Sequence, residues 1–80
     1  MSKNTENVTL TEISLQSEVY REYVFPDGSI YRIDSPDALL LKDGSTGHRV
    51  VASDGVVHYI PGLWIALRWK TKEGELPVAF

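Results

Sequence analysis

The chain has 80 residues and no cysteine, and its 11 acidic and 8 basic residues give a formal net charge of −3 at pH 7. A chain of this length forms one domain with a thin core. The lack of cysteine excludes disulfides, thiol catalysis and thiolate metal sites, and it is typical of a reducing compartment. The negative net charge works weakly against the binding of a polyanion such as nucleic acid.

The first seven residues are polar and contain no apolar run. We therefore expect a flexible N-terminal arm over residues 1–7, followed by a single small β-rich domain over residues 8–80. The arm does not resemble a signal peptide, and no segment is apolar over the length that a bilayer requires. These features predict a cytoplasmic protein with no membrane partner.

The segment 8–16 fits two structures. Val8 and Leu10 alternate with polar residues, and the segment is rich in β-branched side chains, which favours a strand. Leu10, Ile13 and Ser17 are also spaced as on one face of a helix. We favour the strand and keep one short N-terminal helix as the alternative.

The segment 19–33 predicts a β-hairpin. Its Pro26-Asp27-Gly28 sequence is typical of a three-residue loop, because proline presets φ at the first position and glycine adopts the left-handed third position. The expected pairs are Phe25 with Ser29, Val24 with Ile30, Tyr23 with Tyr31, Glu22 with Arg32, and Arg21 with Ile33. We expect the Phe25, Tyr23, Tyr31, Arg21 and Ile33 side to face the core, and the other side to be half-exposed with a cross-strand ion pair.

Turn residues divide the following segments at roughly ten-residue intervals. After a break at 34–37, which could also open one helical turn, the apolar run 38–41 predicts a buried strand. Residues 48–52 and 56–60 predict a second hairpin, whose loop has either two or three residues. Residues 76–80 predict a terminal edge strand, because proline cannot donate to the middle of a sheet. This pattern predicts an all-β fold, a small highly curved antiparallel meander or partly open barrel of five to seven strands.

The most regular alternation lies in segment 63–70, which we interpret as the strand against which the rest packs. The side chains expected to face inward are Leu63, Ile65, Leu67 and Trp69, and those expected to face outward are Trp64, Ala66, Arg68 and Lys70. An aromatic side chain among cations predicts a binding face. The candidate residues of this face are Trp64, Arg68, Lys70, Arg32, Arg49 and Tyr20.

The residues that carry catalysis or bind metals form no recognisable pattern. A three-residue loop in the second hairpin would place His48 and His58 on one face, two pairs apart, without an acidic third ligand. No serine lies in a glycine-x-serine-x-glycine motif, and a small β domain has little concave volume. We therefore predict no catalytic residue, no metal site, no cofactor and no enzymatic activity.

The thin core, the terminal edge strand and the Trp64 and Arg68 pair predict a non-enzymatic protein-interaction module. Its expected partner is a second copy of itself or another protein. One alternative is a small nucleic-acid-binding β-barrel, in which bases stack on Trp64 and cations contact phosphates. Another is a small inhibitory or accessory protein of a microbe or virus.

Overall fold

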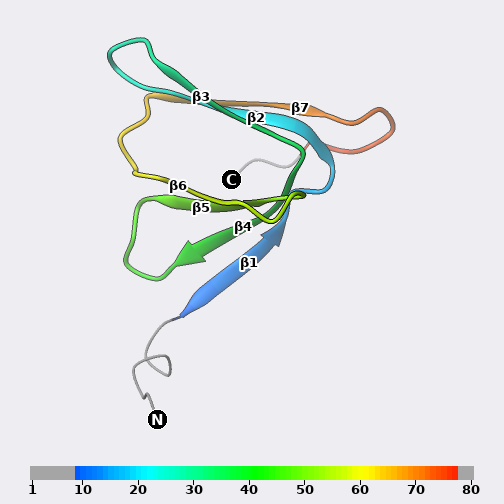
Figure 1. The fold of residues 1–80 in the computed structure, drawn as a ribbon, viewed down its shortest axis with the longest axis horizontal. Coiled ribbons are helices and arrows are strands. Elements are labelled where there is room, and N and C mark those ends of the chain that lie inside the picture. Colours follow the sequence, from blue (N-terminus) through cyan, green and yellow to red (C-terminus); the bar gives the residue numbers. More distant parts are fainter. Residues whose placement is uncertain (1–8, 78–80) are drawn as a thin grey trace.

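The computed structural model describes residues 9–77, which contain seven strands in two antiparallel sheets and no helix (Figure 1). The strands are β1 (Leu10–Ser14), β2 (Glu18–Val24), β3 (Ile30–Asp34), β4 (Pro36–Lys42), β5 (His48–Ala52), β6 (Val57–Ile60) and β7 (Ala66–Thr71). We call the four-stranded sheet β1-β4-β5-β6 sheet A, and the three-stranded sheet β3-β2-β7 sheet B. The predicted all-β meander is confirmed, and the two sheets do not close into a barrel. The N-terminal segment is a strand, so the helical alternative is wrong for its described part, and the arm 1–7 lies outside the described residues.

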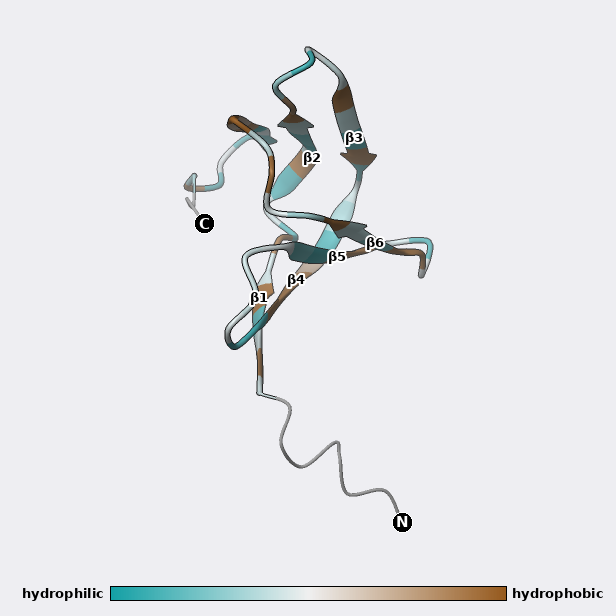
Figure 2. Cartoon of the chain, turned by 90° about the vertical axis from the view of Figure 1, so that its left-hand side faces the viewer, coloured by the Kyte–Doolittle hydropathy of each residue, from teal (hydrophilic) through white to brown (hydrophobic). Residues whose placement is uncertain are grey.

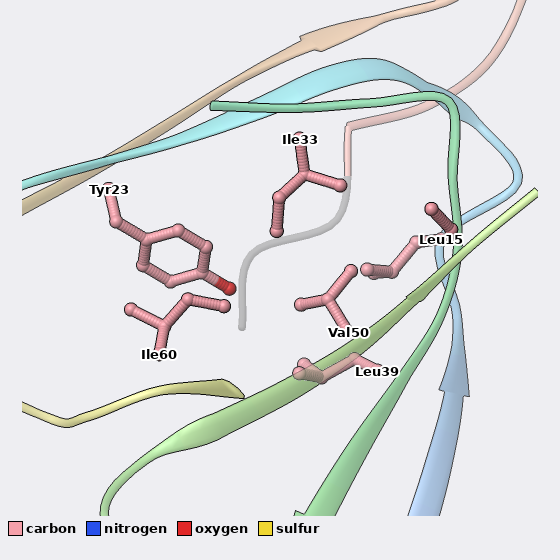
Figure 3. Close-up of a cluster of buried hydrophobic side chains, with 7 residues drawn as sticks. Leu15, Tyr23, Ile33, Leu39, Val50 and Ile60 are labelled. Atoms are coloured by element: carbon pink, nitrogen blue, oxygen red, sulfur yellow. The ribbon is translucent and has the colours of Figure 1, made fainter. Parts of the chain in front are cut away.

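The core lies between the two sheets, which pack face to face (Figure 1). Its buried hydrophobic residues come from both sheets and from the β1–β2 turn: Leu15, Tyr23, Ile33, Leu39, Val50, Ala52 and Ile60. Figure 3 shows six of these side chains pointing toward one another. The chain crosses between the sheets at 15–17, at Ser35 and through 61–65.

Both predicted hairpins form with three-residue loops. The pairing of β2 with β3 follows the expected register from Val24–Ile30 to Arg21–Ile33, and the Phe25 amide donates to the Ser29 carbonyl at 2.9 Å. The loop of the β5–β6 hairpin is closed in the same way, and Gly28 and Gly55 both have φ of 89°. Only glycine adopts this left-handed conformation without strain.

The break predicted between two strands at 34–37 consists of one residue, Ser35, which separates β3 from β4. Ser35 adopts φ of 50°, and β4 begins directly at Pro36, so the alternative of a helical turn is wrong. The Ser35 amide donates to the Val19 carbonyl at 2.9 Å, and the Ser35 carbonyl accepts the Ser53 amide at 3.0 Å. These bonds to both sheets hold a conformation that is uncommon for a residue with a Cβ.

The central strand of sheet B is β2, because it pairs with both β3 and β7. The prediction that segment 63–70 is the organising strand is therefore wrong, since β7 begins at Ala66 and lies at an edge of the sheet. Leu63 and Ile65 lie in the 61–65 connection and are each 69% exposed, rather than buried as expected. The alternation is correct from Ala66 onward, where Leu67 packs against the core and Arg68 is exposed.

The predicted terminal strand 76–80 is described only for its first two residues. Leu76 and Pro77 belong to no strand, and Leu76 is 80% exposed. The remaining residues, 78–80, lie outside the described part of the chain. Between residues 9 and 77 there is no helix of the length and apolarity needed to cross a membrane.

Candidate functional site

The described residues contain no pocket, so the candidate sites on them are surfaces. Over the same range, no three histidine, aspartate or glutamate side chains gather as metal ligands. His48 and His58 do face the same side of sheet A, as the three-residue loop requires. Each is bonded through Nδ1 to a tyrosine hydroxyl of sheet B, His48 to Tyr23 and His58 to Tyr31, at 2.8 Å in both cases.

A chain of buried polar side chains connects the inner faces of the sheets. The guanidinium of Arg21 donates to both carboxylate oxygens of Glu18, at 2.9 and 2.8 Å, and to the Tyr23 hydroxyl at 3.1 Å. Tyr23 Oη lies 2.8 Å from His48 Nδ1. Each group has a partner, as buried polar groups require. This network explains how Arg21 occupies the core side of the hairpin while it is fully buried.

The outward-facing side chains of β2, β3 and β7 form the sheet B face. Strand register arranges them in three rows, Ile30–Val24–Ala66, Arg32–Glu22–Arg68 and Asp34–Tyr20–Lys70. Glu22 accepts from Arg68 at 2.6 Å and from Arg32 at 3.3 Å, which confirms the predicted cross-strand ion pair. Arg32 also donates to Asp34 at 2.8 Å and lies 3.9 Å from the centroid of the Tyr20 ring. Glu22 and Asp34 therefore compensate Arg32 and Arg68, whereas Lys70 forms no ion pair with a described residue.

The structure brings together four of the six predicted face residues. Tyr20, Arg32, Arg68 and Lys70 share the sheet B face. Arg49 is not among them, because it lies on the outer side of sheet A. Trp64 is not among them either.

The prediction that Trp64 points outward is wrong. Its ring packs against the core, with centroids 4.9 Å from Tyr23 and 4.6 Å from His48. The connection 61–65 crosses from one sheet to the other, so it does not follow the alternation of a strand. The bend directs the largest side chain of the connection toward the core, where its aromatic surface is removed from water. Leu63 and Ile65 remain exposed as a consequence.

The outward-facing side chains of sheet A form a second surface, the sheet A face. Its rows are Ser14–Ala38–Val51–Val57 and Glu12–Leu40–Arg49–Tyr59, followed by Leu10–Lys42 at one end. The edge residues Val57 and Tyr59 are 59% and 54% exposed, and Leu10 is 49% exposed. An antiparallel sheet with one wet face normally alternates apolar and polar residues. Sheet A instead carries apolar residues on both of its faces, and Figure 2 shows apolar stretches in the strands of both sheets.

Arg49 lies among these apolar residues. Its guanidinium carbon is 4.9 Å from the centroid of the Tyr59 ring, and its Nη1 atom is enclosed without a hydrogen-bond acceptor. A buried donor without a partner is costly and uncommon in native structures. Glu12 lies in the same row, but Leu40 separates it from Arg49, and no described carboxylate forms an ion pair with Arg49.

The sequence contains a signal for the sheet A face that its alternation pattern obscures. Apolar residues follow one another in 38–41, 50–51 and 56–57. Neighbouring side chains on a strand point to opposite faces, so such pairs place apolar surface on both sides of a sheet. The residues that the sequence reasoning missed are Leu40, Val51, Val57 and Tyr59.

The two outer faces thus differ in chemistry: the sheet B face is charged, with all of its charged residues except Lys70 in ion pairs, and the sheet A face is largely apolar. Comparison of the chain with protein-family models, with curated proteins and with solved structures finds no match. These two surfaces are the candidate functional sites of the described residues.

Proposed function

We propose that this chain is a non-enzymatic protein-interaction module, and that its partner docks on the sheet A face. The observation that carries this proposal is the apolar character of sheet A on both sides. Sheet B covers the inner side, while no described segment covers the outer side. Strands that are apolar on both faces are typical of sheets that are covered on both faces.

The exposed side chains of this face suit a protein partner. Removal of apolar surface from water gains about 25 cal/mol per Å², from which the ordering and desolvation costs of association are subtracted. Tyr59, with the Arg49 guanidinium beside its ring, combines the residue types that dominate binding energy in protein interfaces. The edge strand β6 contains no lysine, glutamate, aspartate or proline, the residues that usually protect a free edge from pairing.

Nucleic-acid binding through the sheet B face is the second candidate. Arg32, Arg68 and Lys70 share this face with the Tyr20 ring, which supports the contact of cations with phosphates and the stacking of a base. A stacked base would have to displace Arg32 from Tyr20, and both arginines are paired with Glu22. This candidate predicts that labelled single-stranded oligonucleotides bind at low salt and dissociate as salt is added.

The leading proposal is tested with a photoreactive benzoylphenylalanine residue in place of Tyr59, and in place of Lys70 as the control. Both positions are exposed, but they lie on opposite outer faces. In the cells that naturally produce the chain, irradiation should crosslink the Tyr59 variant to a protein and leave the Lys70 variant largely unlinked. No protein adduct at position 59, or equal adducts at both positions, contradicts the proposal.

The cytoplasmic assignment and an inhibitory or accessory role in a microbe or virus are further parts of the proposal. The absence of cysteine supports a reducing compartment. An inhibitory or accessory protein would act by binding a protein partner, and the sheet A face is the surface we assign to that contact.

A further inference from the structure

We infer that the partner on the sheet A face is a second copy of the chain, related to the first by a two-fold axis. This inference rests on the proposed function. The distribution of charge on the face supports it. Glu12 lies on the outermost strand β1, and Arg49 lies on β5 in the other half of the sheet. The third charged residue of the face, Lys42, lies at the end of β4, outside the row of Glu12 and Arg49. A two-fold contact brings opposite halves together and thereby opposite charges.

The strand order determines which residues meet. A two-fold axis that runs along the strands between β4 and β5 places β1 over β6 of the second copy, and β4 over its β5. Stacked sheets keep their strand directions within about 30° of each other, so the rows of the two copies remain roughly aligned. Glu12 then lies over Tyr59 of the second copy. In that second copy, the Arg49 guanidinium lies beside the Tyr59 ring. The carboxylate of Glu12 from the first copy therefore lies near the Arg49 guanidinium of the second.

The rest of the face fits the same arrangement. Ala38 faces Val51 of the second copy, and Ser14 faces its Val57, so that small residues meet larger apolar ones. Each copy supplies one carboxylate near the Arg49 guanidinium of the other copy. The ionic contact between Glu12 and Arg49 therefore forms twice, once on each side of the axis.

The sheet B face does not have this self-complementarity. Its edge strands β3 and β7 carry Arg32 and Arg68 on either side of the central Glu22. A two-fold axis along β2 would place Arg32 of one copy over Arg68 of the other. Like charges in direct opposition disfavour a contact. Direct opposition of like charges thus disfavours the sheet B face, whereas the two-fold arrangement on the sheet A face places no charged residue directly over one of like charge.

The size of the face sets the expected strength. Four strands about 4.8 Å apart, with five residues at about 3.3 Å each, cover roughly 300 Å² per copy. Stable interfaces bury about 800 Å² per partner, so this contact is expected to be weak and reversible. Association should therefore depend strongly on protein concentration.

The first experiment measures the mass of the full chain by sedimentation equilibrium, from low micromolar to millimolar concentration. The wild-type mass should rise from that of the monomer toward that of the dimer. Val57→Lys should shift this rise to at least tenfold higher concentration. Ile30→Lys is the matched control, because Ile30 is 52% exposed and lies on the sheet B face, and it should associate as the wild type does.

The second experiment tests the ionic contact between copies. Glu12→Arg alone and Arg49→Glu alone should each weaken association, because like charges then meet across the axis. An equimolar mixture of the two variants should form a heterodimer with affinity near that of the wild type, since each arginine again meets a glutamate. Such recovery on mixing cannot result from a contact within one chain.

Three results would overturn the inference: a monomeric wild type at millimolar concentration, equal effects of Val57→Lys and Ile30→Lys, or no recovery on mixing. These failures are distinguishable from failure of the proposed function. A monomer that still gives protein adducts from position 59 in cells retains the docking face and excludes the second copy as its partner. A monomer without such adducts contradicts both.

Discussion

The hydroxyl oxygen of Tyr23 lies 2.8 Å from Nδ1 of His48 and connects sheet B to sheet A inside the core. Both side chains are buried, and their rings meet edge to face at 5.6 Å. Burial and the nearby charge of Arg21 lower the pKa of His48 to about 4. The imidazole is therefore neutral at pH 7 and can accept the Tyr23 hydrogen on Nδ1. The Tyr31 and His58 pair repeats this contact at a more exposed position.

Tyr23→Phe should reduce the free energy of unfolding by about 1–3 kcal/mol, because it leaves buried nitrogens of His48 and Arg21 without a partner. Urea unfolding followed by tryptophan fluorescence measures this loss. Tyr31→Phe is the matched control, since Tyr31 is 42% exposed and water can replace its hydroxyl. A larger loss from Tyr31→Phe than from Tyr23→Phe would contradict the structural role of the buried bond.

The low pKa of His48 predicts that stability falls as the pH is lowered from about 6.5 to about 4. The unfolded chain, with its histidine pKa near 6.5, takes up the proton first, and protonation then favours unfolding. The contribution of neutral His48 to the free energy of unfolding is fully present above pH 6.5. About 3 kcal/mol of this contribution is lost by pH 4. Urea unfolding at intervals between pH 7.5 and 4 measures it. His48→Gln should flatten this part of the profile, and an unchanged slope in that variant would assign the effect to other groups.

The two hairpins were predictable because the necessary information is local. The Pro26-Asp27-Gly28 loop requires a glycine at φ of 89°, and this requirement fixes the register of β2 with β3. For the second hairpin the sequence did not determine the loop length, because a two-residue and a three-residue turn both fit it. Its structure has the same loop as the first, with Gly55 also at φ of 89°. Turn chemistry thus specified the register of the first hairpin, and for the second it specified only that a hairpin forms.

The position of Trp64 and the existence of the sheet A face were not predictable from local pattern. Whether Trp64 points in or out depends on the crossing at 61–65, which is set by how two sheets meet and not by alternation. The face depends on which strands become neighbours, since Leu40, Arg49 and Tyr59 form one row only after β4, β5 and β6 pair. The sequence did not reveal the long-range pairing of β1 with β4 across the first hairpin, nor that of β2 with β7.

Trp64→Ala should cost about 3 kcal/mol of stability, because the ring contacts Tyr23 and His48 at the edge of the core. Leu63→Ala, in the neighbouring position, should cost less than about 0.5 kcal/mol, since Leu63 is 69% exposed. Thermal unfolding followed by circular dichroism measures both. A larger loss from Leu63→Ala than from Trp64→Ala would contradict the structure and support the sequence-based prediction, in which Leu63 points inward and Trp64 outward.

Alanine substitutions at Gly28 and Gly62 distinguish the cost of backbone strain from the cost of a steric clash. Gly28→Ala should cost about 1 kcal/mol through its positive φ, because an added Cβ meets no atom within 4 Å. Gly62→Ala should cost more, since its Cβ would lie 2.6 Å from the Thr46 carbonyl oxygen and force the 43–47 and 61–65 loops apart. Chemical unfolding of both variants provides the comparison. Equal losses would mean that the two loops move apart easily.

Glu18 and Glu22 lie on the same strand and test the difference between a buried and an exposed ion pair. Glu18 and Arg21 are 2% and 0% exposed, so Glu18→Gln leaves a buried guanidinium without its counter-charge and should cost about 3 kcal/mol or more. Glu22→Gln removes the charge shared by Arg32 and Arg68, whose side chains are 47% and 59% exposed, and should cost less than about 1 kcal/mol. Added salt should reduce the effect of Glu22→Gln and leave that of Glu18→Gln nearly unchanged, because mobile ions screen exposed charges far more than buried ones. Urea unfolding of both variants at low and high salt measures this contrast, and a large, salt-insensitive loss from Glu22→Gln would show that the sheet B face is held together by its ion pairs.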